Sequence, residues 1–355
     1  MITVNELFSG IGAQRAALER AGIEHRVAGI SEIDKYAIKS YEAIYGETRN
    51  YGDISKVDKL DYADFWTYSF PCTDISVAGQ QKGIVKGETR SGLLYEVQRL
   101  LEVAVHTHTQ PKWLMLENVK NLVGKKFRAQ FDEWCDWLDG IGYNTYWQVL
   151  NAKDYGVPQN RERVFAVSVR KDIDDGNFRF PDKKFLDIRL KDILEDEVDE
   201  KYYLSDKILQ GFKAHNERHA EKGTGFIFKP RDTDGIASTI RANSSLCPTD
   251  NAVCIQAGSL NHYDEMNRVY SAEGCSPTLR TMQGGDRQPR VIDSYDNRRV
   301  RRLTPLECWR LMGFTDEAFH KAEAVCSNSQ LYKQAGNSIV VDVLVGIFKN
   351  IFKED

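Results

Sequence analysis

Residues 1 to about 170 alternate short β-rich runs with amphipathic helical stretches. The β-rich runs are ITVNELF, RVAGISEI, ADFWTYSF, KWLMLEN, YNTYWQVLN and RVFAVSVR, and helices are predicted between them over residues 12–21, 34–45, 92–106 and 125–140. Such alternation is typical of a sheet whose strands are joined by helices that cover both faces. The sequence therefore predicts a doubly wound, Rossmann-like α/β domain over residues 1–175.

The rest of the chain has a different texture. Residues 185–225 are rich in Asp, Glu and Lys and predict a linker with short helices, whereas residues 226–300 are rich in turn-forming residues and predict only short strands. Residues 337–351 form a last helical pattern with one apolar face. We therefore expect a second, loop-rich domain with its linker over residues 176–325, and a C-terminal segment, 326–355, that returns to the first domain.

Composition excludes several classes of protein. Hydrophobic residues make up 41% of the 355-residue chain and charged residues 28%, as in an ordinary globular protein. The seven cysteines are scattered without a C-x-x-C pair, which argues against a disulfide framework or a zinc site. The N-terminus lacks a basic stretch before an apolar run, and no apolar segment has the length of a membrane span. We therefore expect a cytoplasmic protein without a membrane anchor. Because the net charge is only −4, any nucleic-acid contact must come from a local patch.

Two further patterns are interpreted as structural. His215 and His219 lie four apart on a predicted helix, but the spacing H-E-x-x-H is absent and no third ligand is near, so we expect no metal site. Phe65, Trp66 and Tyr68 belong to a β-rich run and are interpreted as core packing, not as a platform for stacked bases.

Polar residues and glycines follow the first predicted strands. In LFSGIG, Gly10 and Gly12 let the backbone approach a ligand, and the helix that begins there favours a polar or anionic group. In SEID, Glu32 is placed to accept from ribose hydroxyls and Ile33 to lie on an adenine face, and in GDIS, Asp53 is placed to accept from an adenine amino group. One such acid alone is commonly a helix cap. Three at the ends of successive strands predict a nucleoside cofactor.

The fourth strand end carries a cysteine, in SFPCTDIS. Burial as a small apolar residue is the commoner role of an isolated cysteine. Cys72, however, follows Pro71 beside the predicted cofactor pocket and precedes the glycine-rich VAGQQKGIVKGETRSG, which we interpret as a mobile lid over a nucleophile. Lys82 and Arg90 of this lid would meet phosphates.

The next two predicted strands supply partners for the thiol. LMLENVKNL gives Glu117, and VPQNRERVFAV gives Arg161 and Arg163. A carboxyl group and guanidinium groups that converge on a thiol suit attack on a ring that must be polarised. The alternative for Glu117 and Arg163 is a salt bridge that ties neighbouring strands together.

Eight motifs, in this order and at these intervals, resemble the DNA (cytosine-5)-methyltransferases: FSGIG, SEID, GDIS, FPCTDIS, LENV, QNRER, RRLTPLECWRLMGF and QAGNSIVVDV. The resemblance covers residues 4–171 and 298–350. It implies a class I methyltransferase fold with a smaller target-recognition domain, and a monomer. It also implies methylation of carbon 5 of a cytosine flipped out of a specific sequence in double-stranded DNA, in restriction-modification or phage self-protection. The alternatives are an RNA cytosine methyltransferase, disfavoured by the long segment between the two motif blocks, and a catalytically silent DNA-binding regulator, disfavoured by the intact site motifs.

The resemblance also implies roles for individual residues. Cys72 would add to carbon 6 of the cytosine, Glu117 would meet ring nitrogen 3, and Arg163 would hold the exocyclic oxygen, with Arg161 completing the catalytic site. S-adenosylmethionine would be held by Phe8, Gly10, Gly12, Glu32, Ile33, Asp53, Ile54, Pro71, Leu93, Asn337 and Ser338. One departure is Thr73, where many relatives have Gln; it is expected to adjust the lid or the orphan guanine side.

DNA reading is predicted from a weak repeat. ASTIRAN (237–243) and SPTLRTM (276–282) are similar, and TLRTMQGG resembles the Thr-Leu element of the family's target-recognition domains, although such residues are also ordinary in strands. The tract RQPRVIDSYDNRRVRR adds six basic residues against two acidic ones. Arg241, Arg280 and Gln283 would read base edges, while Thr278, Gly284, Arg298, Arg299, Lys82 and Arg90 would contact the DNA backbone.

Overall fold

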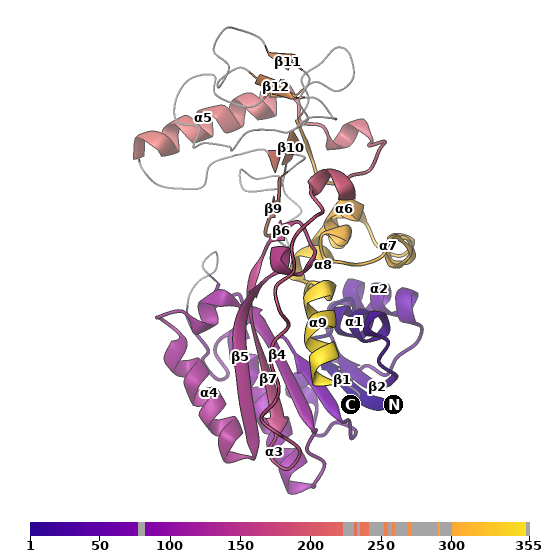
Figure 1. The fold of residues 1–355 in the computed structure, drawn as a ribbon, viewed down its shortest axis with the longest axis vertical. Helices are drawn as coiled ribbons and strands as arrows, with labels where there is room; N and C mark the ends of the chain where they lie inside the picture. Colours follow the sequence, from indigo (N-terminus) through magenta and orange to yellow (C-terminus); the bar gives the residue numbers. More distant parts are fainter. Residues whose placement is uncertain are drawn as a thin grey trace.

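A mixed six-stranded sheet forms the body of the molecule, in the strand order β2-β1-β3-β4-β7-β5 (Figure 1). The computed structural model describes residues 1–76, 82–222, 231–232, 235–240, 252–254, 258–259, 268–270, 290–291 and 300–352. The sheet strands are β1 (Ile2–Leu7), β2 (His25–Ser31), β3 (Phe65–Tyr68), β4 (Trp113–Val119), β5 (Tyr143–Asn151) and β7 (Glu162–Arg170). Strands β1 to β4 run parallel, whereas β7 is antiparallel to both of its neighbours, β4 and β5.

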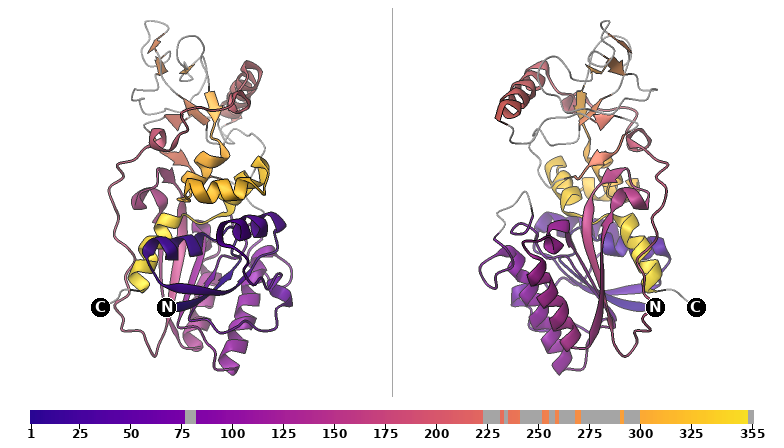
Figure 2. Two further views of the ribbon diagram at one scale, coloured as in Figure 1. Left: turned by 90° about the vertical axis from the view of Figure 1, so that its right-hand side faces the viewer. Right: turned by 60° about the vertical axis from the view of Figure 1, so that its left-hand side comes forward.

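Helices cover both faces of this sheet, which confirms the doubly wound fold (Figures 1 and 2). The helices are α1 (Ala13–Ala21), α2 (Lys35–Tyr45), α3 (Leu94–His106), α4 (Arg128–Gly140), α5 (Asp206–Lys222), α6 (Pro305–Arg310), α7 (Asp316–Glu323), α8 (Asn328–Asn337) and α9 (Val341–Ile351), with short 3₁₀ turns η1 (Ile54–Lys56), η2 (Arg90–Leu93), η3 (Lys120–Val123), η4 (Ala152–Tyr155), η5 (Leu190–Ile193) and η6 (Glu200–Tyr202). Local signals set several of these limits. Gly22 ends α1 in the left-handed conformation, and the Asp34 carboxylate begins α2 by accepting the amide of Tyr36.

Successive strand residues serve two different cores. Phe65 of β3 packs with α1 and α9 on one face, whereas Trp66 and Tyr68 pack with α3 and α4 on the other. The Tyr68 hydroxyl accepts the indole N–H of Trp134 at 3.2 Å. The prediction that these aromatic residues are core packing is confirmed, because all three are buried.

Helix α9 lies beside α1 on the body of the molecule (Figure 1). The ring of Phe348 meets that of Phe65 edge to face, with their centroids 5.4 Å apart. The predicted helix over residues 337–351 is wrong at its start, since Asn337 is the last residue of α8 and Ser338 is extended. The connection is fixed from outside, because the Val341 amide donates to the Met312 carbonyl.

The second part of the chain is joined to the body by a short strand pair. β6 (Gln159–Asn160), just before β7, pairs in parallel with β9 (Ala237–Ser238). The other short strands are β8 (Arg231–Asp232), β10 (Ala252–Cys254), β11 (Gly258–Ser259), β12 (Arg268–Tyr270), β13 (Arg290–Val291) and β14 (Val300–Arg302). Over residues 185–225, where the sequence predicts a linker with short helices, the structure has the short turns η5 and η6, followed by α5, a single helix of 17 residues.

His215 and His219 both lie on α5, with their ring centroids 4.3 Å apart. Among the described residues, no three His, Cys, Asp or Glu side chains gather in a way that could hold a metal ion. Within the same part of the chain, no helix combines the length and apolarity that crossing a lipid bilayer requires.

One acidic side chain is fully buried within the main sheet. Glu6 of β1 is 0% exposed, and its Oε2 accepts the Tyr41 hydroxyl at 2.7 Å. Burial raises the Glu6 pKa to about 7, against the opposing effects of Tyr41 and Arg15. The folded protein therefore keeps a proton between about pH 4.5 and pH 7 that the unfolded chain releases.

We predict that the native state becomes less stable as pH rises, because the folded protein holds a proton on Glu6 that the unfolded chain does not. Across that window, the free energy of unfolding should fall by up to about 3 kcal/mol because of Glu6. Glu6→Gln removes this contribution, so the variant should gain stability relative to the wild type between pH 4.5 and pH 8. Urea unfolding of both proteins at the two pH values measures the effect. An equal difference between the proteins at both pH values would contradict it.

Candidate active site

The turn that follows β1 holds a left-handed backbone. Phe8, Gly10 and Gly12 have φ angles of 58°, 56° and 78°. The Gly10 amide donates to Glu32 Oε2 at 2.9 Å, and the Phe8 amide donates to the Ser31 carbonyl at 2.8 Å. A Cβ atom at Gly10 would meet no atom within 4 Å. The backbone of Gly10 therefore borders open space, as a turn that receives a ligand requires.

The end of β2 lies against this turn. The second carboxylate oxygen of Glu32 accepts the amides of Ile33 and Asp34, both at 2.8 Å. Ile33 is 65% exposed, an unusual position for a large apolar residue. Glu32 thus fixes the turn with its oxygens, and Ile33 offers an apolar surface beside it.

The strand expected before Asp53 is absent, and that prediction is wrong. Asn50 makes only an isolated bridge with Ile30, because its side chain takes over the pairing by bonding both the amide and the carbonyl of Glu32. Asp53 instead caps η1 by accepting the amide and hydroxyl of Ser55, which lowers the Asp53 pKa. The Ile54 side chain is buried in the core and has no open surface.

Cys72 lies in a tight turn after β3. Its carbonyl accepts the amides of Ile75 at 3.1 Å and Ser76 at 2.8 Å. The Ser91 hydroxyl donates to the Pro71 carbonyl at 2.7 Å. The turn is therefore stabilised by hydrogen bonds within its own backbone and by a hydrogen bond from Ser91 of η2.

Thr73 and Asp74 complete this turn. The Thr73 hydroxyl donates to Asp74 Oδ2 at 3.3 Å, and the same oxygen accepts the Ser91 amide at 3.1 Å. The Asp74 carbonyl accepts the Gly83 amide at 2.9 Å, which ties Gly83 of the predicted lid to the turn. Asp74 and Ser91 were missed by sequence reasoning, although an Asp two residues after Cys72 is a common turn signal.

Glu117 and Arg163 meet across β4 and β7. Because these strands are antiparallel, the start of β7 lies beside the end of β4, with Arg163 paired to Val119. Arg163 Nε lies 3.3 Å from Glu117 Oε1, with side-chain exposures of 17% and 7%. Glu117 Oε2 accepts the Ser69 hydroxyl at 2.6 Å, another contact that the sequence did not predict. The salt bridge considered from the sequence is therefore present, and it lies in the same site as Cys72.

Burial and charge both act on the thiol. Burial raises the pKa of Cys72, and the Glu117 carboxylate raises it further, while Arg163 and Arg161 lower it less. Asn118 donates to the Phe70 carbonyl at 2.9 Å and so binds β4 to the chain just before Cys72. The site therefore favours the protonated thiol, and a carboxylate and two guanidinium groups act on its charge in opposite directions.

Arg161 is buried, and its guanidinium group is hydrogen-bonded to backbone carbonyls. Its guanidinium donates to the carbonyls of Ile240 at 2.9 Å, Gly336 at 3.0 Å and Ser338 at 2.8 Å. Burial, followed by repulsion from Arg163, lowers the Arg161 pKa to about 9. Arg161 thus anchors the segment after α8, where Ser338 is buried and Asn337 is exposed.

The remaining predicted residues divide into two groups. Lys82 and Arg90 are exposed, and Leu93 is half-buried at the start of α3. The predicted DNA-reading residues Arg241, Thr278, Arg280, Gln283, Gly284, Arg298 and Arg299 lie outside the described residues.

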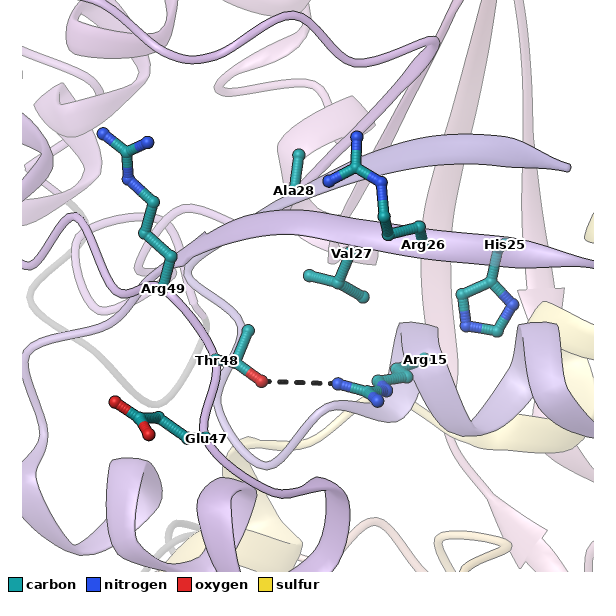
Figure 3. Close-up of a pocket in the computed structure, with 8 residues that line it drawn as sticks. All are labelled: Arg15, His25, Arg26, Val27, Ala28, Glu47, Thr48 and Arg49. Carbon is teal, nitrogen blue, oxygen red and sulfur yellow. Dashed lines mark hydrogen bonds between the residues drawn. The ribbon is translucent and has the colours of Figure 1, made fainter.

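A separate pocket of ≈ 320 Å³ opens between α1, β2 and the segment after α2 (Figure 3). It is lined by Arg15, His25, Arg26, Val27, Ala28, Glu47, Thr48 and Arg49. None of the predicted cofactor or catalytic residues lines it. Within this pocket, Arg15 Nη1 donates a hydrogen bond to the Thr48 hydroxyl at 3.4 Å.

Solved structures show that this fold is that of the class I methyltransferases. The Entamoeba histolytica methyltransferase EhMeth has a TM-score of 0.72 at 17% identity, over 99% of this chain and 98% of that protein. The S. pombe Dnmt2 methyltransferase has a TM-score of 0.68 at 20% identity, over 98% and 97%. These similarities concern the fold.

Sequence comparisons define the family. The C-5 cytosine-specific DNA methylase family matches residues 2–353. The chain is 35% identical to the type II methyltransferase M2.ScrFI of Lactococcus lactis subsp. cremoris, over 99% of both proteins. It is 33% identical to the orphan methyltransferase M.SPBetaI of Bacillus phage SPbeta, over 99% of this chain and 97% of that protein. The chain belongs to the C-5 cytosine-specific DNA methylase family and is a DNA cytosine-5 methyltransferase.

We predict opposite effects of the two charged neighbours on the reactivity of Cys72. Glu117→Gln should speed alkylation of Cys72 by iodoacetamide at pH 8, because removing the carboxylate lowers the thiol pKa. Arg163→Gln should slow it, since a positive charge is lost and Glu117 remains. Mass spectrometry of the Cys72 peptide measures the rate, with Cys326 as an internal control. A change of the same sign in both variants would contradict the assignment.

Proposed function

We propose that this methyltransferase acts on a cytosine that is flipped out of duplex DNA, through a covalent adduct of Cys72. The observation that carries the proposal is the meeting of three groups at one edge of the sheet. Cys72 lies in a turn after β3, and Glu117 and Arg163 form an ion pair across β4 and β7 beside it. Nucleophile, acid and anion-stabilising group are thus supplied by three neighbouring strands.

These groups match what cytosine methylation demands. Carbon 5 of cytosine is a poor nucleophile, so the ring must first gain electron density. The Cys72 thiolate forms a bond to carbon 6, while Glu117 shares a proton with ring nitrogen 3 and Arg163 donates to the exocyclic oxygen. Carbon 5 then takes a methyl group and gives up its proton to a solvent water molecule. As it does so, the bond from carbon 6 to sulfur breaks, and its electron pair returns to sulfur to restore both the ring and the thiolate.

The raised pKa of Cys72 has a role in this scheme. A thiol that is neutral at rest is protected from oxidation and alkylation, and it must lose its proton when the base is bound. The positive charges of Arg163 and Arg161 lower the pKa of the thiol and so favour the thiolate. Because carbon 6 lies inside the base stack of a duplex, the cytosine must leave the helix to reach this sheet edge.

The turn after β1 fits the cofactor of the family. S-adenosylmethionine would supply the methyl group as an electrophilic sulfonium. The open backbone at Gly10, the carboxylate of Glu32 and the exposed side chain of Ile33 form a surface for a nucleoside. Asp53 is half-buried at the start of η1, with its carboxylate held by Ser55. We assign the biological role to restriction-modification or phage self-protection, from the kinds of relatives found.

Loss of the thiol tests this proposal. We predict that Cys72→Ala lowers methyl transfer at least about 10³-fold, because covalent activation of the ring is lost. Binding of S-adenosylmethionine should stay within about twofold of the wild type, since the thiol acts on the base. Bisulfite sequencing of plasmid DNA from expressing cells measures methylation, and calorimetry measures cofactor binding. Cys135→Ala, a half-buried cysteine on α4, is the matched control and should keep both. Substantial methylation by Cys72→Ala would refute covalent catalysis by this residue.

A further inference from the structure

The two glycines of the turn after β1 have different surroundings. A Cβ atom at Gly10 would meet open space, whereas one at Gly12 would lie 2.6 Å from the Tyr45 ring and 2.7 Å from the Tyr41 ring. The Tyr45 hydroxyl also donates to the Gly12 carbonyl at 2.9 Å. Gly12 is therefore held by α2, and only Gly10 of the two is free to face a ligand.

The two tyrosines are themselves braced. The Tyr41 hydroxyl donates to the buried Glu6, and the centroids of the two tyrosine rings are 4.9 Å apart. The Arg15 guanidinium lies 4.7 Å from the Tyr45 ring centroid and donates at 3.5 Å to the Tyr45 carbonyl. Its bond to Thr48, drawn in Figure 3, ties α1 to the chain just after α2. Tyr45 is thus fixed on three sides.

The Gly12 carbonyl lies where the turn becomes a helix. It accepts the Ala16 amide at 2.9 Å, the first hydrogen bond of α1, and the Gly12 amide donates to the Ser9 carbonyl at 3.0 Å. The Tyr45 hydroxyl is thus a second donor to this carbonyl, beside the Ala16 amide, and it restrains the orientation of the carbonyl from α2. A rotation of Gly12 would move Gly10, which is only two residues away.

We propose that Tyr45 is a positioning residue for cofactor binding. Resting on the proposed function, the inference is that its hydroxyl and ring hold Gly12 in the left-handed conformation, so that the Gly10 backbone and Glu32 present a preformed surface to S-adenosylmethionine. Tyr45 itself does not touch the cofactor. The turn is thus already ordered before the cofactor binds, which lowers the loss of conformational entropy on binding.

Tyr45→Phe tests this inference, because it keeps the ring and removes one hydrogen bond. The Kd and KM for S-adenosylmethionine should rise about 3- to 10-fold, the effect of one net hydrogen bond, while kcat at saturating cofactor and KM for DNA stay within about twofold. Tyr62→Phe is the matched control. It removes the hydrogen bond of 3.0 Å from the Tyr62 hydroxyl to Asp64. Because Asp64 lies just before β3, at the end of the sheet opposite the turn after β1, this change should leave cofactor affinity unchanged.

A second variant and the possible outcomes complete the test. Gly12→Ala should weaken cofactor binding more than Tyr45→Phe does, because the new methyl group would displace both rings. Equal cofactor affinity in Tyr45→Phe and the wild type would overturn the inference. So would a fall in kcat as large as the loss of affinity, or an equal loss of affinity in Tyr62→Phe. A wild-type chain that binds no S-adenosylmethionine would instead refute the proposed function.

Discussion

The antiparallel pairing of β4 and β7 is the constraint on which the candidate site depends. In a wholly parallel sheet, the start of a strand lies at the edge opposite the ends of its neighbours. Because β7 runs in reverse, Arg163 at its start reaches Glu117 near the end of β4. The same reversal puts Arg161 and Gln159, just before β7, at this edge. There the side chain of Gln159 donates to the Leu311 carbonyl and accepts the Ile240 amide.

Electrostatics then follows from this arrangement. Glu117 is almost completely buried, and a buried carboxylate needs partners, which Arg163 and Ser69 supply. The pair places opposite charges beside Cys72, and these charges act on its pKa in opposite directions. A ligand that approaches the guanidinium or takes a proton from the site would shift that balance. One ion pair therefore both joins β4 to β7 and sets the electrostatic surroundings of Cys72.

Much of this architecture was predictable because it depends on local sequence patterns. The strands before Cys72 and at Glu117 are β-rich runs, and the turn at Gly10 carries glycines that favour its backbone conformation. Asp53 was expected to follow a strand, as Glu32 does, but the side chain of Asn50 takes over the pairing that would form one. The apolar periodicity likewise extended the predicted last helix back to Asn337. Such a pattern carries no information about the hydrogen bonds that Arg161 donates to the carbonyls of Gly336 and Ser338, on either side of Asn337.

The role of Tyr45 was hidden for a similar reason. It lies 33 residues from Gly12, and no local pattern links a tyrosine at the end of one helix to a glycine at the start of another. Contacts of this kind depend on how α1 and α2 pack on the same face of the sheet. The sequence could therefore name the glycines of the turn, but the difference between Gly10 and Gly12 required their surroundings.

Covalent trapping is the most direct measurement of the central claim. DNA amplified with 5-fluorocytosine in place of cytosine carries a substituent at carbon 5 that cannot leave as a proton, so the adduct at carbon 6 would persist. With S-adenosylmethionine present, the wild-type chain should form a complex that survives denaturing electrophoresis, and its DNA-linked peptide should contain Cys72. A chain that methylates ordinary DNA but forms no such complex, or one linked through another residue, would contradict the account.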